Sequence, residues 1–253
     1  MASKRIACIT GATAGIGEAT ARLLADHGFS LILCGRRADR LQALQTELSG
    51  RTSVTTLRFD IRNKQEVQTA VESLPPAWRE VDVLINNAGG AHGLDPIQTG
   101  KPDDWDVMID VNVKGLLYMS HAIVPGMVLR KSGHIVNLGS IAGREVYGNG
   151  NVYCASKFAV DALSRGMRID LNGTGVKVTQ INPGLVETEF SMVRFKGDET
   201  RASKPYQGLD PLQGKDIADM ILFALTRPPH VVVADLVVFP LAQASATVVK
   251  RED

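Results

Sequence analysis

Thr10-Gly11-Ala12-Thr13-Ala14-Gly15-Ile16-Gly17 is the stretch that decides the fold, since it joins an apolar run at residues 4–9 to a helical pattern at residues 16–26. Its glycines permit a tight turn and let the backbone approach a diphosphate at the start of the helix, where unpaired N–H groups and the helix dipole favour anions. The order Gly-x-x-x-Gly-x-Gly differs from the commoner Gly-x-Gly-x-x-Gly, but it stands at the first strand–helix junction, as a dinucleotide site requires. We therefore expect a cofactor to contact Gly11, Thr13, Gly15, Ile16 and Gly17.

Short β-branched runs alternate with helical patterns along the whole chain. The expected strands are residues 4–9, 30–34, 54–59, 81–85, 134–138, 176–181 and 236–239, and the expected helices are residues 16–26, 38–48, 64–73, 103–129, 152–171 and 215–226. Most of these strands are apolar throughout, as parallel strands covered on both faces are. The sequence therefore predicts an α/β fold: a single-domain, doubly wound, parallel seven-stranded sheet of the Rossmann type with helices on both faces.

Length and composition agree with one globular domain. The chain has 253 residues, 44% of them hydrophobic and 22% charged, which excludes a disordered chain, a collagen and a coiled coil. No low-complexity linker divides residues 1–253, so we expect a single domain. Residues 187–213 are polar, contain Gly and Pro and lack clear periodicity, and we interpret them as a substrate lid without regular structure.

The charge balance and the cysteines limit the partners and the compartment. A net charge of +1 gives no field to attract nucleic acid or an anionic membrane, and apolar stretches such as residues 231–239 are shorter than the roughly 20 residues that span a bilayer. The three cysteines and five histidines lack the spacing of metal ligands, so no metal is expected. An odd set of cysteines and the lack of a secretory signal favour a cytoplasmic enzyme with a small-molecule substrate.

The second expected strand ends in Cys34-Gly35-Arg36-Arg37, and this end indicates which dinucleotide binds. A site selective for NAD places an Asp or Glu there to bind the ribose 2′-hydroxyl, whereas the nearest acid here, Asp39, belongs to the start of the next helix. Two guanidinium groups suit a 2′-phosphate by charge and by bidentate geometry. Although a solvated Arg pair is the alternative, we expect Arg36 and Arg37 to bind NADP.

Tyr153 and Lys157 are four residues apart on an expected helix and so share one helix face. A Lys ammonium near a phenol favours the phenolate and lowers the Tyr pKa from about 10 toward neutral pH, and such a Tyr can exchange a proton with an alcohol oxygen. The pair arises by chance on many helices. Here it follows Gly139-Ser140 at a strand end, in a chain with the glycine-rich turn, which favours a catalytic site.

Together these residues resemble the short-chain dehydrogenase/reductase family, and the resemblance covers essentially the whole chain. Residues 10–17 match its cofactor motif, Asp60-Ile61 its adenine-contact position and Asn86-Asn87-Ala88-Gly89 a further motif, and Pro183-Gly184 with Thr188 match its loop beside the nicotinamide. The catalytic tetrad of the family matches Asn112, Ser140, Tyr153 and Lys157.

The resemblance implies a role for each matching residue. Tyr153 would be the general acid/base, Lys157 would lower its pKa and bind the ribose of the nicotinamide, Ser140 would polarise the substrate oxygen, and Asn112 would anchor a water in the proton path. Cofactor contacts are implied for Asp60, Ile61, Asn87, Ala88, Gly89, Tyr153, Lys157, Pro183, Gly184, Val186 and Thr188. Members of the family commonly associate through the helices expected here at residues 103–129 and 152–171, which implies a homotetramer or a homodimer.

Residues 188–198 resemble the lid of the NADP-dependent 3-hydroxy acid dehydrogenases of this family, which act on serine, allo-threonine and 3-hydroxypropionate-type substrates. We therefore expect hydride transfer between the nicotinamide and a short 3-hydroxy acid or its carbonyl form. A substrate carboxylate in a closed pocket needs a cationic partner. Arg194 in the lid and Arg144 near Ser140 are the candidates, and Arg194 is favoured because a lid residue couples closure to recognition.

Other functions fit the same motifs less well. A 3-oxoacyl carrier-protein reductase or a broad-range carbonyl reductase is the alternative enzyme, but a carrier protein needs a basic surface and the expected lid has interleaved charges. A nucleotide-sensing regulator without turnover is disfavoured because Tyr153 and Lys157 are both present. A methyltransferase would have no use for Ser140, Tyr153 and Lys157 together.

Overall fold

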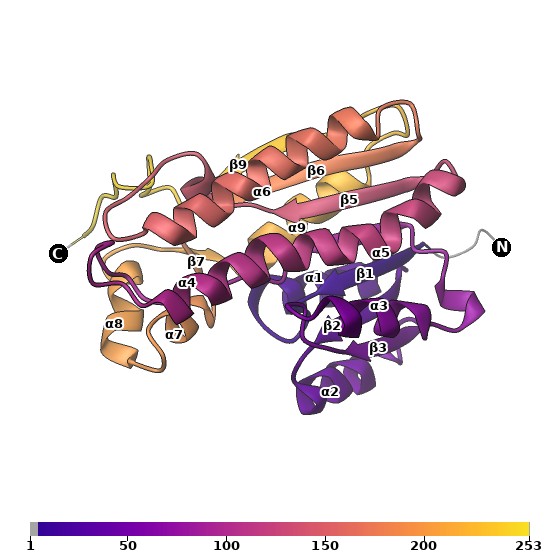
Figure 1. Ribbon diagram of the computed structural model, residues 1–253, viewed down its shortest axis with the longest axis horizontal. Helices are drawn as coiled ribbons and strands as arrows, with labels where there is room; N and C mark the ends of the chain where they lie inside the picture. Colours follow the sequence, from indigo (N-terminus) through magenta and orange to yellow (C-terminus); the bar gives the residue numbers. More distant parts are fainter. Residues whose placement is uncertain (1–4, 253) are drawn as a thin grey trace.

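A seven-stranded parallel sheet forms the centre of the computed structural model, which describes residues 5–252 (Figure 1). The strand order is β3-β2-β1-β4-β5-β6-β9, and every neighbouring pair is parallel. The strands are β1 (Ile6–Thr10), β2 (Ser30–Gly35), β3 (Val54–Arg58), β4 (Val83–Asn86), β5 (Gly133–Leu138), β6 (Val176–Pro183) and β9 (Asp235–Val238). The order reverses between β1 and β4, and a ligand crevice is expected where that happens. The predicted fold class is confirmed.

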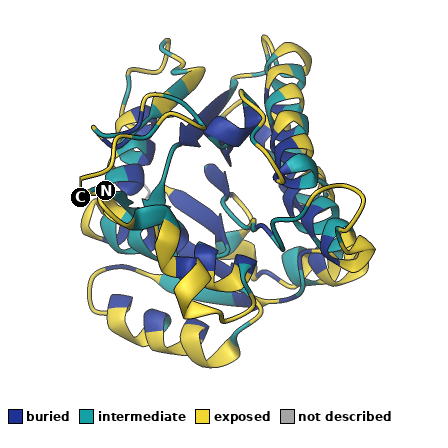
Figure 2. Cartoon of the chain, turned by 90° about the vertical axis from the view of Figure 1, so that its left-hand side faces the viewer, coloured by how far each residue is buried: buried dark blue, intermediate teal, exposed yellow. Residues whose placement is uncertain are grey.

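Helices cover both faces of this sheet. They are α1 (Gly15–Asp26), α2 (Ala38–Leu48), α3 (Lys64–Glu72), α4 (Pro102–Ile109), α5 (Leu116–Leu129), α6 (Asn151–Asp170) and α9 (Gly214–Leu225), with short 3₁₀ turns at Pro76–Trp78, Ile141–Gly143 and Lys204–Tyr206. Leu24, Leu44 and Ile221, from α1, α2 and α9, pack on one face of the sheet, and residues of α3 and α5 pack on the other. Figure 2 shows the central strands buried and the exposed residues on the outer surfaces of the helices, whereas the edge strands β3 and β9 are only partly buried. Alternate residues of the central strands thus enter two separate cores.

The single helix expected at residues 103–129 is interrupted. A π-helical segment, Asp110–Gly115, separates α4 from α5, and it brings the Gly115 Cα so close to the Ile61 side chain that a Cβ would lie 2.9 Å from it. By length and composition alone, the 28-residue run Pro102–Leu129 is the one helix in the described part of the chain that could cross a membrane. Its Met119 and Met127 pack against the sheet as core residues.

The lid region differs from the expectation, because it has regular structure. It contains β7 (Val186–Glu187), α7 (Phe190–Arg194), α8 (Glu199–Ser203) and β8 (Leu212–Gln213), and β7 pairs with β8 in parallel. Elements of two to five residues are too short to give a periodic sequence pattern, which is why the sequence did not reveal them. The lid lies beside the start of α4, where Lys196 Nζ is 2.8 Å from Asp104 Oδ1 (Figure 1).

Candidate active site

A cavity of about 690 Å³ opens at the carboxyl ends of the central strands. It extends from the glycine-rich turn after β1, past the ends of β2, β4 and β5, to α7 of the lid. The predicted site residues that line it are Gly11, Thr13, Gly15, Ile16, Arg36, Arg37, Asp60, Ile61, Asn87, Ala88, Gly89, Ser140, Tyr153, Lys157, Pro183, Gly184, Val186, Thr188 and Arg194. Three predicted residues, Gly17, Asn112 and Arg144, lie outside its lining.

The glycine-rich turn has the conformation and the open helix start that an anion needs. Gly11 and Gly15 have φ values of +65° and +54°, in the left-handed region that favours glycine. The side chain of Asn87 donates to the Thr10 carbonyl at 2.9 Å and so ties the turn to β4. Ala14, the N-cap of α1, offers no side-chain hydrogen bond, so the first N–H groups of α1 remain available to a ligand.

Gly17 has a packing role in this turn. A Cβ at Gly17 would lie 2.4 Å from both the Asn87 side chain and the Gly11 carbonyl. Gly17 therefore lets α1 pack closely against the turn, as the third glycine of such motifs does, and its expected contact with a cofactor stays a prediction.

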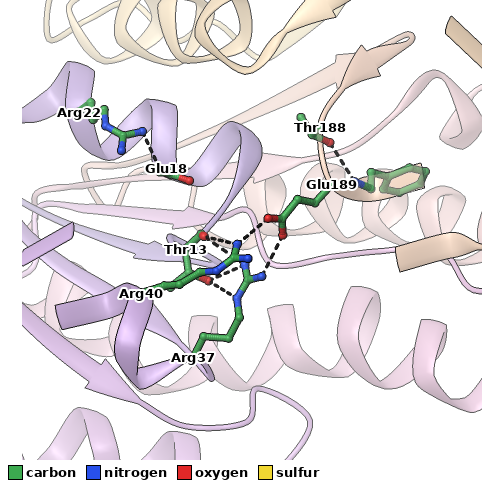
Figure 3. A network of polar contacts seen from close by, with 8 residues as sticks. Thr13, Glu18, Arg22, Arg37, Arg40, Thr188 and Glu189 are labelled. Carbon is green, nitrogen blue, oxygen red and sulfur yellow. Dashed lines mark hydrogen bonds and ion pairs between the residues drawn. The ribbon is translucent and has the colours of Figure 1, made fainter. Parts of the chain in front are cut away.

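The two arginines after β2 have separate environments, contrary to the expectation that they act as a pair. Arg37 donates to Thr13 Oγ1 at 3.0 Å and to Glu189 Oε2 at 2.9 Å, so its guanidinium joins the glycine-rich turn to the lid (Figure 3). Arg40, one turn further along α2, binds the other oxygen of Glu189 at 2.5 Å. Arg36 is exposed at the cavity wall and makes no side-chain hydrogen bond or ion pair with the described residues.

Glu189 and Asp60 are the acidic residues in the cavity lining, and both are paired. Hydrogen bonds from Arg37 and Arg40 lower the pKa of Glu189, and a hydrogen bond from Arg62 lowers the pKa of Asp60. Glu189 and Arg40 were not predicted as site residues, because 149 residues separate them and no motif links them.

Tyr153 and Lys157 project from α6 beside Ser140, and all three line the cavity. Lys157 Nζ donates to the Leu138 carbonyl at 2.9 Å, and burial lowers the pKa of Lys157 to about 8. Burial also raises the pKa of Tyr153, while the Ser140 hydroxyl and the Arg194 charge act in the opposite direction. Ser140 and Arg194 therefore favour the phenolate, and the same effect of Lys157, expected from the sequence, stays a prediction.

Arg194 extends from the end of α7 to Tyr153. Its guanidinium carbon lies 5.7 Å from the centre of the Tyr153 ring. Two hydrogen bonds hold it, from Nε to the Gly93 carbonyl at 2.9 Å and from Nη1 to the Tyr147 hydroxyl at 3.0 Å. Arg194 is 9% exposed, so its charge acts in a poorly hydrated space. Nη2 and one Nη1 hydrogen remain for an anion in the cavity.

Arg144, the second candidate for a substrate carboxylate, is placed elsewhere. Its guanidinium pairs with Asp161 of α6 at 3.1 Å and with Asp235 of β9. A cation between two carboxylates does not turn toward the cavity, so the structure does not support Arg144 as a substrate contact. Asp235 is 91 residues away in sequence, which is why sequence reasoning missed this pairing.

Asn112 also lies behind the cavity wall. Its side chain accepts from the Gly90 N–H at 2.9 Å and donates to the Gly90 carbonyl and to Ser156 Oγ, both at 2.9 Å. These bonds use both amide hydrogens and one lone pair of the oxygen, so the side chain fixes the segment after β4 against α6. The water that the resemblance assigns to Asn112 stays a prediction.

The comparisons with known proteins agree with this geometry. A family model described as short chain dehydrogenase matches residues 5–199. A protein of Salmonella typhi, "NADP-dependent 3-hydroxy acid dehydrogenase YdfG", is 47% identical over 242 residues, which are 95% of this chain and 97% of that protein. "Sulfoacetaldehyde reductase 2" of Chromohalobacter salexigens is 46% identical over 249 residues, 98% of this chain and 99% of that protein.

Solved structures of dehydrogenases are also similar to this chain. The closed form of a serine dehydrogenase complexed with NADP⁺ has a TM-score of 0.92 and 44% sequence identity, and the match covers 98% of this chain and 100% of that one. A serine dehydrogenase from Escherichia coli has a TM-score of 0.82 and 39% identity, over 94% and 99% of the two chains. The sequence motifs, the parallel sheet and these relatives lead to one conclusion: the chain belongs to the short-chain dehydrogenase family.

Proposed function

We propose that the protein is an NADP-dependent oxidoreductase that interconverts a short 3-hydroxy acid and its carbonyl form. The observation that carries this proposal is the position of Arg194, a buried cation next to the Tyr153 ring inside the cavity. A dehydrogenase of neutral alcohols has no use for a desolvated charge at this point, whereas a substrate carboxylate needs one.

The residues at the other end of the cavity fit NADP. The glycine-rich turn and the open start of α1 suit a diphosphate. The guanidinium of Arg36 at the cavity wall has no partner among the described residues, and Arg62, which pairs with Asp60, also lines the cavity. A 2′-phosphate requires such cations. The related serine dehydrogenase structure contains NADP⁺, which supports the same choice.

The catalytic residues can bind and protonate a carbonyl oxygen. Ser140 Oγ accepts from the Ala142 N–H at 3.1 Å, and its own hydrogen can be donated to a substrate oxygen. Tyr153 provides the proton that the oxygen gains during reduction and takes it back during oxidation. NADPH, when bound, supplies the hydride. Lys157, charged below its pKa of about 8, would bind the ribose hydroxyl groups.

A sulfonate is the second candidate for the acidic group. One relative is named a sulfoacetaldehyde reductase, and the geometry around Arg194 favours a monoanion without requiring a planar one, because its free N–H groups face an open cavity. A two-carbon sulfonate and a three-carbon carboxylate place the charge at a similar distance from the reacting carbon.

Turnover with matched substrates tests the proposal. Reduction of NADP⁺ is followed with 3-hydroxypropionate, with 2-hydroxyethanesulfonate and with 1-propanol, and each is repeated with NAD⁺. We expect a higher kcat/KM for an acid than for 1-propanol, and a higher kcat/KM with NADP⁺. Equal kcat/KM values for 3-hydroxypropionate and 1-propanol would refute the proposal that the substrate is an acid. The acid with the higher kcat/KM shows whether the substrate carries a carboxylate or a sulfonate.

We also propose that the protein is a cytoplasmic homotetramer or homodimer. Exposed apolar side chains on α5 and α6, such as Leu129 at 85% and Ile169 at 76% exposure, support association through these helices. The cysteines Cys8, Cys34 and Cys154 are all free and buried, as is usual in a reducing compartment. Light scattering during gel filtration tests the assembly, and a monomer would contradict it.

A further inference from the structure

We propose that Asp235 and Arg144 are positioning residues for Ser140, and that they act through the side chain of Asn182. This inference rests on the proposed function, since it assigns Ser140 a part in the reaction. It concerns a cluster of charged and amide groups behind the cavity, beside the carboxyl ends of β5 and β6 and the first residue of β9. Asn182, Asp235, Arg144 and Asp161 form this cluster and do not line the cavity.

Asn182 is the central residue of this cluster. It is fully buried at the end of β6, and its Oδ1 accepts from the Ser140 N–H at 3.2 Å and from Gln180 Nε2 at 2.8 Å. Its Nδ2 donates to Asp235 Oδ1 at 2.5 Å. A carboxylate can only accept, so Asp235 determines which way the Asn182 amide points. With the amide reversed, its NH₂ group would face the Ser140 N–H, and two donors would meet.

Gly139 allows this contact to form. A Cβ at position 139 would lie 2.0 Å from Asn182 Oδ1, so only glycine lets the amide oxygen come this close to the backbone at the end of β5. Ser140 is the next residue. Its N–H bond to Asn182 therefore fixes the chain at the point where the Ser140 hydroxyl enters the cavity.

Arg144 connects this arrangement to the helix that carries the other catalytic groups. Its guanidinium binds Asp235, and it also binds Asp161 at 3.1 Å. Asp161 lies on α6, one helical turn after Lys157. The side chains of Arg144 and Asp161 are 21% and 14% exposed, and removal of one partner from such a poorly hydrated group leaves a charge without compensation.

The path from Asp161 through Arg144, Asp235 and Asn182 thus joins α6 to Ser140. It sets the separation between the Ser140 hydroxyl and the Tyr153 hydroxyl, which both have to contact one substrate oxygen. A displacement of about 1 Å in a reacting group lowers the rate roughly 100-fold. Loss of the path should therefore lower kcat, whereas binding of the adenosine end of the cofactor, which is distant from Ser140, should stay unchanged.

Exchange of the amide and the carboxylate between positions 182 and 235 gives a specific test. We expect Asp235→Asn and Asn182→Asp each to lower kcat roughly 10- to 100-fold, while the Kd of NADPH, measured by its fluorescence, stays within about twofold of that of the wild type. In the double variant Asn182→Asp/Asp235→Asn the donor and the acceptor change places, and the carboxylate at 182 still accepts from the Ser140 N–H. We expect this variant to recover most of the lost kcat, a rescue that a purely structural defect would not give.

A matched control removes a charge from the same cluster without breaking the path. Arg165 Nε contacts Asp161 at 2.9 Å on the exposed side of α6, and we expect Arg165→Gln to have wild-type kcat. If Asn182→Asp does not fold, as circular dichroism would show, Arg144→Gln becomes the test, with kcat again lowered and NADPH binding kept.

Two results would overturn the inference. One is wild-type kcat in Asp235→Asn or Arg144→Gln, and the other is a folded double variant that is no faster than the slower single variant. Failure of the proposed function is a separate result, because wild-type protein would then turn over none of the hydroxy acids.

Discussion

Replacement of Arg194 by Gln removes the buried charge that we assign to the substrate acid. End-on binding of a carboxylate by Nη1 and Nη2 provides two charge-assisted hydrogen bonds, each of which contributes about 1.5–3 kcal/mol. With the lower figure, the loss is about 3 kcal/mol. At about 1.4 kcal/mol for each factor of ten, kcat/KM for 3-hydroxypropionate should then fall at least about 100-fold.

The same change also removes the contacts of Arg194 with Gly93 and Tyr147, so a displaced lid has to be distinguished from a lost ion pair. Oxidation of 1-propanol makes this distinction, because it uses the same lid and carries no charge. We expect kcat/KM for 1-propanol to change by less than about threefold, since such a substrate forms no charge-assisted bond with Arg194. Arg194→Lys keeps the charge and should lie between the wild type and Arg194→Gln for the acid. Equal losses for the acid and for 1-propanol would refute the assignment of Arg194.

Four further outcomes follow from the site. Arg36→Ala should weaken NADPH binding by about 1.5–3 kcal/mol, the contribution of one charge-assisted contact, and leave the Kd of NADH almost unchanged. Equal losses of affinity for the two cofactors would show that Arg36 stabilises the fold and does not bind the 2′-phosphate. Tyr153→Phe should lower kcat by about 10²–10⁴-fold with NADPH binding retained, because only the oxygen that carries the proton is removed; near-normal turnover would exclude it as the acid/base. Glu189→Gln removes a negative charge from Arg37 and should tighten NADPH relative to NADH by about two- to fivefold, the scale of an exposed ion pair, with Glu187→Gln as a control on the same lid. NADPH affinity should fall as the pH rises through about 8, where the lowered pKa of Lys157 removes the ammonium; a flat profile from pH 7 to 9 would contradict this.

Site residues close together in sequence could be predicted, because their spacing along the chain fixes their spacing in space. The turn at residues 10–17 and the Tyr153–Lys157 pair are of this kind. Arg194 was predicted from its place in the lid, and the structure brings it to Tyr153.

Pairings between distant segments could not be predicted from a single sequence. Arg37 was expected to face a phosphate, but Thr13 and Glu189 use most of its donors. The hydrogen-bond partner of Lys157 could not be predicted either, because helix periodicity gives the shared face of the helix but not the direction of a flexible side chain; its ammonium donates to the Leu138 carbonyl. Each of these differences results from a partner supplied by the tertiary fold.

Oxidation of 3-hydroxypropionate and of 1-propanol by the wild-type protein, each with saturating NADP⁺ and followed by the absorbance of NADPH, tests the central claim most directly. A buried Arg194 beside Tyr153 predicts a kcat/KM for the acid that exceeds the value for 1-propanol by at least about 100-fold, which corresponds to the free energy of two charge-assisted hydrogen bonds. Equal values for the two substrates, or a preference for 1-propanol, would contradict it.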